Sequence, residues 1–358
     1  MSFEIFDLSQ KEKWTSYLEM LPQQKQDIFF TPEYYELFER RGDGKAFCFV
    51  FLKNEHVALY PFLKNSINEL ELLDLENEYF DIQGAYGYNG LLTSNQETNL
   101  IEAFNLAFIT FCNKQNIIAE FTRFNPLLDN HNLSTYHEVI QTNKNITIDL
   151  RMDLDEIRSK CYEQRARKGI NKAKRNDVTV KLFSGNEIDD SGIKVFTDIY
   201  LSTMKRNDAD DFFYFENQFL LNVKQLLKNN SIYFIALKDE IPVSCELVIF
   251  RGKNAYGFIG GTLVDYYQFN PNSLLKDFLI EKLKGMGFDF YSMGGWQTPY
   301  DGIYKYKKSF SKNKEYDFYI GKNIHNIQVY KKVCQAWENK YPEKKENYKN
   351  RLLKYRAV

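Results

Sequence analysis

Several features that mark other protein classes are missing from this sequence. Its five cysteines are scattered, without paired spacing or matching histidines, so neither a disulfide framework nor a zinc site is expected. No apolar run approaches the roughly 20 residues that a membrane-spanning helix needs, and the N-terminal residues lack the apolar core of a signal peptide. The formal net charge of −1 does not favour a nucleic-acid binder. We therefore expect a soluble, cytoplasmic protein without a bound metal.

The sequence does contain enough apolar material for large cores. With 358 residues and 44% hydrophobic content, the chain is long enough for two ordinary domains. Because it has 25 tyrosines and 30 phenylalanines, we expect rings with polar tips to line a site as well as to fill cores.

Residues 254–311 form the stretch around which the chain is predicted to be organised. A strand at 255–259 ends at Gly260 and Gly261, and a helix begins after the Asn-Pro-Asn sequence at 270–272. A second strand, at 288–293, runs into Gly294 and Gly295. This pattern puts bare backbone N–H groups at a sheet edge beside a helix N-terminus, where phosphate or a polarised carbonyl can bind.

The order of predicted elements is the same in the two halves of the chain. The first half has predicted strands at 3–8, 46–53, 56–63, 70–75, 117–124 and 146–150, and helices at 11–21, 32–41 and 96–114. The second half has strands at 178–183, 232–238, 243–250, 255–259, 288–293 and 316–320, and helices at 188–205, 215–227 and from 273. We expect domains at 1–150 and 179–322, joined by a basic linker helix at 151–178 and followed by a helical tail at 323–358.

The basic segment between the halves, residues 153–177, allows two interpretations. Its arginines and lysines are dense and its apolar content is low, which is typical of a solvated helix. Alternatively, part of it faces a multiply charged ligand.

Several local strings, in this order, resemble the FemAB-related branch of the GNAT acyltransferase superfamily. They are AYGYNGLL (85–92), RFNPLL (123–128), ITIDL (146–150), RARKGINKAKR (165–175), TMKRNDA (203–209), PNSLL (271–275), MGGW (293–296) and YKYKKSF (304–310). The resemblance implies an α/β (α+β) fold of two tandem GNAT-like domains, each a mixed, mostly antiparallel sheet flanked by helices. It also implies transfer of an acyl or aminoacyl group to an amine that is bound between the domains.

The resemblance leaves the donor and the acceptor open. Our leading expectation is N-acylation of a nucleotide-linked amino sugar, such as a dTDP-linked one for surface polysaccharide synthesis, with acyl-CoA as co-substrate. The chain has no coiled-coil insertion and no net basic charge, which argues against the alternative, an aminoacyl-tRNA-dependent peptidoglycan-precursor aminoacyltransferase. A non-enzymatic tandem-domain binding protein is a further alternative. The loop before the helix at 273 departs from the GNAT pyrophosphate loop because it contains no glycine.

Amine attack on a thioester or ester needs a proton acceptor, and carboxylates are the best candidates. Glu246 interrupts an apolar strand, where burial would raise its pKa, although alternation also allows it to point outward, opposite Cys245 and Leu247. Asp210 and Asp211, in a loop, are alternative bases. The four histidines (His56, His131, His137, His325) lie outside the matched strings, and we predict turn or surface positions for them.

The resemblance implies further site residues. Tyr256 and Arg206 match acceptor-contacting positions, and Tyr304 or Tyr306 matches the tyrosine that protonates the leaving group. The other predicted substrate contacts are Tyr214, Trp296 and Lys307, the last neutralising phosphate. The predicted donor contacts are Gly260, Gly261, Asn272, Ser273, Gly294 and Gly295.

Overall fold

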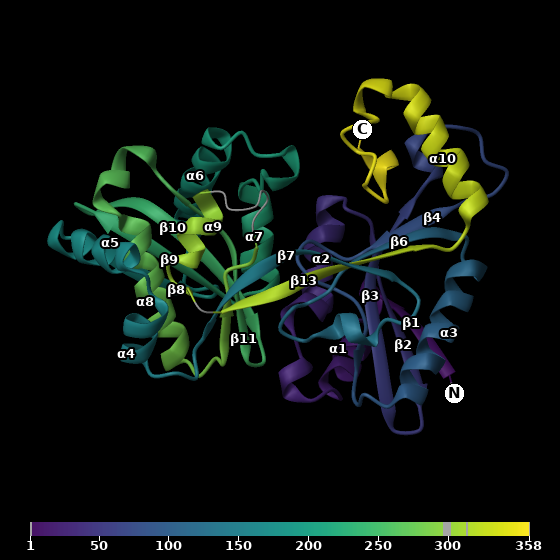
Figure 1. Ribbon diagram of the computed structural model, residues 1–358, viewed down its shortest axis with the longest axis horizontal. Helices are drawn as coiled ribbons and strands as arrows, with labels where there is room; N and C mark the ends of the chain where they lie inside the picture. The colour runs from purple at the N-terminus through teal and green to yellow at the C-terminus, as the bar shows by residue number, and fades with distance from the viewer. Residues whose placement is uncertain (1, 296–301, 313, 358) are drawn as a thin grey trace. The chain divides into compact units, whose positions relative to one another are not determined.

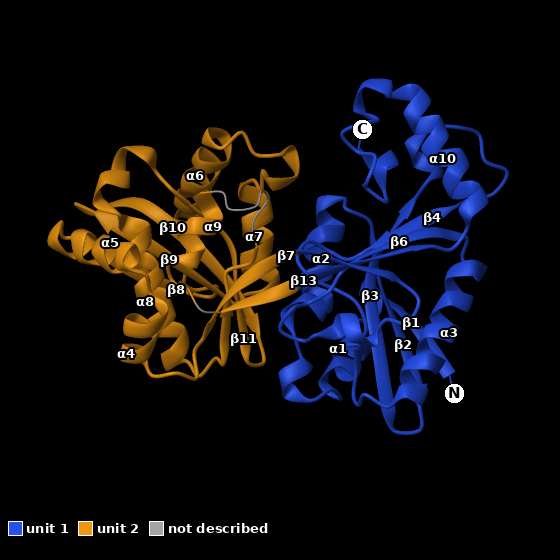
Figure 2. Cartoon of the chain, in the orientation of Figure 1, with its two compact units in different colours: residues 1–142, 318–358 blue, residues 143–317 orange. Residues whose placement is uncertain are grey.

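The computed structural model describes residues 2–295, 302–312 and 314–357. These residues form two compact units: unit 1 comprises residues 1–142 and 318–358, and unit 2 comprises residues 143–317 (Figure 2). None of the described helices is both long and apolar enough to span a membrane.

Unit 1 is built on a six-strand path in the order β1-β2-β3-β4-β6-β13 (Figure 1). The strands are β1 (Ser2–Asp7), β2 (Lys45–Lys53), β3 (His56–Ser66), β4 (Phe80–Gln83), β6 (Ile117–Arg123) and β13 (Glu315–Ile324), and the short β5 (Leu92–Thr93) pairs with β3. Only β4 and β6 pair in parallel; the other neighbours are antiparallel. The helices are α1 (Lys11–Glu19), α2 (Pro32–Arg41), α3 (Thr98–Lys114) and α10 (Ile327–Lys340).

Local sequence explains where the helices of unit 1 begin and end. Thr31 accepts a hydrogen bond from the Tyr34 N–H, Pro32 opens α2, and Gly42 ends it in a left-handed conformation. Phe104 and Phe108 of α3 pack on one face of the sheet, against Phe49 and neighbouring rings. Helix α10 packs through Val333 and Trp337 onto Ile118 and Ala119 of β6.

Unit 2 repeats this arrangement in the strand order β8-β9-β10-β11-β12-β7. The strands are β7 (Glu138–Asp149), β8 (Thr179–Ser184), β9 (Ser231–Lys238), β10 (Ile241–Arg251), β11 (Asn254–Thr262) and β12 (Phe290–Ser292). The helices are α4 (Leu154–Glu156), α5 (Gln164–Arg175), α6 (Asp190–Arg206), α7 (Asn217–Leu226), α8 (Pro271–Gly285) and α9 (Gly302–Lys308). Helices α5 and α8 share a core with one face of the sheet, while α6 and α7 pack on the other face, through Phe196 on Tyr233 and Phe219 on Phe258.

The predicted repeat of strand, two helices, three strands, helix and strand is confirmed, with two corrections. The predicted strand at 70–75 is wrong: Asn68–Leu70 is a 3₁₀ turn, and the leucines that follow pack as loop residues near α10. The last strand of each half was assigned to the wrong unit, because β13 pairs with β6 in unit 1 and β7 pairs with β12 in unit 2. Accordingly, the predicted linker segment 151–178 lies in unit 2, and the predicted tail 323–358 lies in unit 1.

Candidate active site

A buried polar cluster in unit 2 joins β10, α8 and β12. Lys276 Nζ, on α8, lies 2.5 Å from Oε1 and 2.6 Å from Oε2 of Glu246, on β10. The Tyr291 hydroxyl, on β12, donates to Glu246 Oε1 and accepts from Lys276 Nζ at 2.7 Å. The Lys276 side chain is 5% exposed and that of Glu246 is 15% exposed, so Glu246 is the less buried partner of this ion pair.

Strand alternation places Glu246 in this cluster. Cys245 lies on the face of β10 that meets α6, where its Sγ is 3.7 Å from the Phe196 carbonyl. Glu246 lies on the opposite face with Val248, and α8 covers that face. The alternation predicted for Glu246 is therefore confirmed, but the interpretation that it points outward into solvent is wrong.

Burial and charge act in opposite directions on Lys276. Burial lowers the pKa of its ammonium group, and the Glu246 carboxylate partly offsets that effect. Burial, together with the charge of Glu246, raises the pKa of the Tyr291 hydroxyl well above its ordinary value. Tyr291 is therefore a neutral hydrogen-bond donor at neutral pH, and the carboxylate faces two donors.

Gly257 of β11 leaves the space that the cluster occupies. A Cβ atom there would lie 2.8 Å from the Tyr291 hydroxyl and 2.9 Å from Glu246 Oε1. The register between β10 and β11 also shifts at Leu247 and Val248, so the strand carries a bulge beside Glu246. The bulge and Gly257 thus both lie next to the Glu246 carboxylate.

Strands β11 and β12 separate next to this cluster. Their parallel pairing ends at Tyr256 with Ser292, whereas β11 continues to Thr262. Beyond Ser292 the chain turns to β7, because the Met293 N–H donates to the Ile146 carbonyl at 2.9 Å and the Ile146 N–H donates to the Gly294 carbonyl at 3.2 Å. The backbone of β11 from residue 257 onward thus has a strand partner only on the β10 side among the described residues.

The glycines predicted to contact the donor have close neighbours. A Cβ atom at Gly260 would lie 2.7 Å from the Cys245 carbonyl oxygen, and one at Gly261 would lie 2.6 Å from Thr203 Oγ1 on α6. One at Gly295 would lie 2.9 Å from Asn145 Oδ1, and Gly294 has a left-handed φ of 71°. The packing of β11 and the turn after β12 therefore require these glycines, and their contact with a donor stays a prediction.

The N-terminus of α8 is also occupied by protein contacts. The Asn272 carbonyl accepts from the Tyr306 hydroxyl at 3.0 Å. Ser273 is buried and packs against Gly169 of α5. A Cβ atom at Gly169 would lie 2.7 Å from Ser273 Oγ, so only glycine fits there. A donor role for Asn272 and Ser273 stays a prediction.

The residues predicted to contact the acceptor fall in different places. Arg206 ends α6, where Nη1 donates to the Thr262 carbonyl at 2.9 Å and the guanidinium lies 4.9 Å from the Tyr267 ring centroid. Tyr256 is buried on β11, and alternation places it on the face opposite Gly257 and Glu246. Tyr214 is half-buried after the 3₁₀ turn Asp211–Phe213.

The α9 residues have their own partners. The Tyr304 hydroxyl donates to Glu315 at 2.8 Å, and Lys307 Nζ donates to the Gly295 carbonyl at 2.6 Å. Burial and, to a smaller extent, the charge of Glu246 raise the pKa of the Tyr306 hydroxyl well above its ordinary value. Trp296 lies outside the described residues.

The alternative bases are not part of the Glu246 cluster. Asp210 accepts from the Phe212 N–H at 3.0 Å and so caps the 3₁₀ turn that follows, while Asp211 is exposed. The cluster members that the sequence analysis missed are Lys276 and Tyr291. Lys276 could have been found as a charge on the same helix face as Ile280 and Leu283, which are both apolar and buried.

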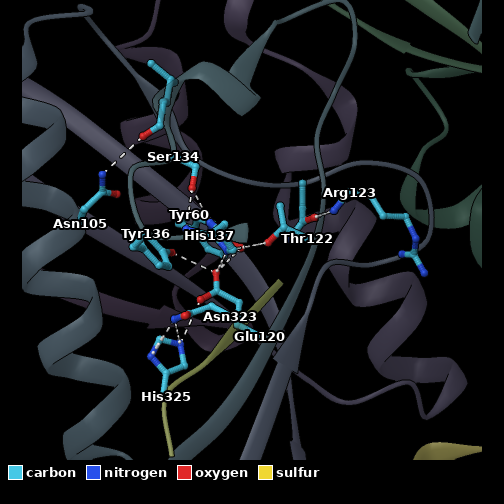
Figure 3. Close-up of polar contacts among 12 residues, drawn as sticks. Tyr60, Asn105, Glu120, Thr122, Arg123, Ser134, Tyr136, His137, Asn323 and His325 are labelled. Carbon is cyan, nitrogen blue, oxygen red and sulfur yellow. Dashed lines mark hydrogen bonds and ion pairs between the residues drawn. The ribbon is translucent and has the colours of Figure 1, made fainter. Parts of the chain in front are cut away.

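A second buried polar cluster, in unit 1, shows that the histidine prediction was wrong for His137 and His325 (Figure 3). Both side chains are 1% exposed, and their Nε2 atoms lie 2.9 Å and 3.1 Å from the two oxygens of Glu120. Tyr60 and Tyr136 donate to Glu120 Oε1 at 2.7 Å and 3.0 Å.

In this cluster Cys112, Glu120 and His325 bring ligand atoms within 4.8 Å of one another, a spacing that would suit a metal ion. Three groups already surround Glu120 Oε1 and His325 lies against Oε2, so the carboxylate is satisfied by hydrogen bonds. Burial alone would raise the pKa of Glu120, but His137 and His325 outweigh it and hold that pKa below its ordinary value. The arrangement is that of a buried, ionised carboxylate with structural partners.

Comparisons with known proteins agree with this fold. Residues 153–269 match the FemAB-like family, described as peptidoglycan biosynthesis and recognition. The chain is similar to FemX, with 14% identity, a TM-score of 0.66, and coverage of 93% of this chain and 100% of FemX. It is also similar to L-PGS from Bacillus licheniformis, with 12% identity, a TM-score of 0.56, and coverage of 91% and 94%. No curated protein matches the sequence.

A tandem GNAT protein from the clavulanic acid biosynthesis pathway shares the fold as well. Its identity is 8% and its TM-score 0.50, with coverage of 91% of this chain and 98% of that protein. At such identities the structures show a common fold, and the family match covers residues 153–269, which is less than half of the chain. Together they show that the chain shares the fold of these proteins and that residues 153–269 are similar to the FemAB-like family.

Proposed function

We propose that the chain transfers an aminoacyl group from aminoacyl-tRNA to the amine of a peptidoglycan precursor. This was an alternative in the sequence analysis, and the family match together with the likeness to FemX favours it over acylation of a nucleotide-linked amino sugar from acyl-CoA. The observation that carries the proposal is the position of Glu246, a carboxylate held by Lys276 next to the point where β11 and β12 stop pairing.

The proposed chemistry needs few groups. The acceptor amine loses a proton to Glu246, directly or through a water molecule, and attacks the ester carbonyl carbon of the donor. A C–N bond forms, the C–O bond to the tRNA ribose breaks, and the ribose oxygen takes up a proton. In this scheme the N–H groups of β11 beyond Tyr256 donate to the carbonyl oxygen as it becomes negative.

Lys276 has a positioning role in this scheme. Its ammonium group bonds both carboxylate oxygens and so fixes the orientation of Glu246. Once Glu246 takes a proton, the buried ammonium loses its counter-charge, which favours passing that proton on to the leaving oxygen.

Among the described residues of unit 1, no strand edge is left without a neighbour in the way that β11 is left beyond Tyr256. The parallel pair of unit 1, β4 and β6, ends in the same way, but Asn89 fills the space beyond β4. The Asn89 N–H donates to the Arg123 carbonyl at 2.7 Å, and the Arg123 N–H donates to Asn89 Oδ1 at 2.9 Å. We therefore assign the transfer reaction to unit 2.

The exposed face of α5 supports a polyanionic donor. Its apolar side, with Ala166, Ile170 and Ala173, is buried on the core, which leaves its basic side chains in solvent. These are Arg165, Arg167, Lys168, Lys172, Lys174 and Arg175. A helix face of this kind suits the phosphates of tRNA and contributes through counter-ion release.

The proposal is tested by incubating the purified full chain with radiolabelled aminoacyl-tRNAs and a UDP-linked muramyl pentapeptide. We expect label to move to the pentapeptide. A parallel reaction with acyl-CoAs and a dTDP-linked amino sugar follows thiol release. Thiol release without aminoacyl transfer would overturn the proposal and restore the amino-sugar reaction.

A further inference from the structure

The basic helix α5 packs on α8, the helix that carries Lys276. The two helices lie side by side in unit 2 (Figure 1). Ser273, Asp277 and Glu281 follow one another at four-residue steps along α8, so they form one ridge of that helix. A Cβ atom at Gly169 of α5 would lie 2.7 Å from Ser273 Oγ, so the two helices approach closely at this end of the ridge.

Asp277 is the buried centre of this ridge. Its side chain is 3% exposed, and Arg158 bonds both of its oxygens, Nε to Oδ1 at 2.8 Å and Nη2 to Oδ2 at 2.9 Å. The Tyr162 hydroxyl donates to Oδ1 at 3.1 Å. Arg158 Nη2 also donates to Glu281 Oε2 at 2.6 Å. The Asp277 carboxylate is therefore fixed by donors from the chain segment that leads into α5.

A π turn brings Arg158 and Tyr162 to the same acid. The Tyr162 N–H donates to the carbonyl of Ile157, five residues back, at 3.3 Å. Turns of this kind are rare and are frequent at functional sites. Arg167, in the first turn of α5, donates through Nη1 to the Tyr162 carbonyl. The π turn is thus bonded to α8 through side chains and to α5 through Arg167.

The arginine that bonds Asp277 is distinct from the cations that face solvent on α5. Lys168, Lys172 and Arg175 make no ion pair within the part of the chain that the structure describes. Their spacing of four and three residues places them along one exposed stripe of α5. Arg158 therefore holds the helix, and the stripe is available to phosphates.

Stability alone does not account for the bonds to Asp277. Desolvation of a buried ion pair offsets much of the attraction between its charges, so an apolar contact would stabilise the two helices as well. A planar guanidinium and a carboxylate add a fixed geometry, because they meet in one orientation. A fixed α5 holds a bound polyanion in a set position relative to Lys276 and Glu246.

We propose that Asp277 is a positioning residue for the transfer reaction and acts through Arg158 and Tyr162. By holding α5 on α8, it keeps a tRNA that is bound to α5 where its ester reaches Glu246. This inference rests on the proposed function. Loosening these bonds should slow transfer from bound aminoacyl-tRNA without weakening tRNA binding.

The test compares single-turnover transfer from saturating aminoacyl-tRNA with the Kd of the same tRNA, measured by fluorescence titration. Arg158→Lys keeps the positive charge but loses the two-pronged bond to Asp277. We expect its transfer rate to fall roughly 10- to 100-fold, as for a misplacement of about 1 Å, while its tRNA Kd stays within about 3-fold of the wild-type value. Arg151→Lys is the matched control, because Arg151 bonds both oxygens of Asp149, at 2.9 and 2.7 Å, outside α5 and α8. It should change neither quantity.

Tyr162→Phe is the milder second variant. It removes only the hydroxyl and keeps the ring, whose centroid lies 5.1 Å from that of Phe310, so it tests the proposal even if Arg158→Lys fails to fold. Loss of one hydrogen bond to a charged group should slow its transfer by roughly 10-fold. Melting temperatures check that each variant is folded.

Wild-type transfer rates in Tyr162→Phe and in a folded Arg158→Lys would overturn the inference. So would a tRNA Kd that rises as much as the rate falls, which would make Arg158 a tRNA contact, or an equal loss of rate in Arg151→Lys. Absence of transfer in the wild type would overturn the proposed function, and this inference with it. Normal transfer in the wild type and in both variants would overturn this inference alone.

Discussion

Lys276 Nζ lies within 2.6 Å of both carboxylate oxygens of Glu246, and this ion pair crosses from α8 to β10 inside unit 2. Desolvation of two charges costs several kcal/mol, so such a pair is weak evidence for stability and stronger evidence for a specific task. Its neighbours Gly257 and Tyr291 fit around the carboxylate, and β11 leaves its partner strand next to it.

Gly257→Ala should disturb this site directly. The added methyl group would lie under 3 Å from both Glu246 Oε1 and the Tyr291 hydroxyl, so the cluster must shift. Overpacking of this kind typically costs about 1–3 kcal/mol, and we expect transfer to fall by at least 10-fold. Gly285→Ala is the control, because a Cβ atom there meets nothing within 4 Å and the residue ends a helix. Thermal melts and kcat/KM of both variants check this prediction. Equal kcat/KM in Gly257→Ala and Gly285→Ala would mean that the site lies elsewhere.

Arg206→Ala and Tyr256→Phe should weaken acceptor use more than protein stability. Loss of a charge-assisted contact costs about 1.5–3 kcal/mol, or roughly 10- to 150-fold in kcat/KM. Because Arg206 also donates to the Thr262 carbonyl, its variant should lose a little stability. Steady-state kinetics with varied acceptor, alongside melting temperatures, check this prediction. Unchanged kinetics in both variants would mean that the acceptor binds elsewhere.

Neutralising the basic face of α5 should weaken tRNA binding and should also reduce the salt dependence of that binding. In Lys168→Gln/Lys172→Gln, each lost phosphate contact should reduce the slope of log affinity against log salt by roughly 0.7 to 0.9. Fluorescence titration of tRNA at several salt concentrations measures the slope. Lys331→Gln/Lys332→Gln on α10 removes the same charge from unit 1 and is the control. If both double variants retain the wild-type slope, α5 does not contact tRNA.

The Glu120 cluster predicts a pH-dependent stability. The folded-state pKa of Glu120 lies below the ordinary value of 4.5, so the unfolded state binds more protons between the two values. The stability that Glu120 contributes is therefore complete above about pH 4.5 and is lost as the pH falls below it. Urea unfolding from pH 7 to 3 should show this loss in the wild type. In Glu120→Gln, stability should be lower at pH 7 and should fall less steeply below pH 4.5; a slope equal to that of the wild type would contradict this account.

Sequence periodicity was sufficient to predict most helices and strands, because each has a clear apolar face. It could not show that β7 and β13 pair in the other half, since which sheet a strand joins depends on long-range pairing. Glu246 stood out as a charge in an apolar strand. Its partner Lys276 was missed, although it lies on the same helix face as the buried, apolar Ile280 and Leu283.

The histidines illustrate the same limit. His137 and His325 are 188 residues apart in number, yet both reach Glu120, and no local pattern predicts such a meeting. Gly294 and Gly295 were correctly recognised as a break after β12, but the prediction that Gly260 and Gly261 end a strand is wrong, because both lie within β11. Glycine is needed there because β10 and α6 approach closely.

The most direct test of the account is single-turnover transfer from aminoacyl-tRNA to the amine acceptor, measured in the wild type and in Glu246→Gln across pH 5 to 9. Removal of a general base typically lowers the rate by roughly 10² to 10⁴ and flattens the acid limb of the profile. Because the substitution also leaves Lys276 without its counter-charge, Glu246→Gln/Lys276→Met is measured beside it to separate lost folding from lost chemistry. We predict slow transfer in both variants, with donor binding retained in the folded double variant. A folded variant that keeps the wild-type rate and acid limb would contradict the assignment of Glu246 as the base.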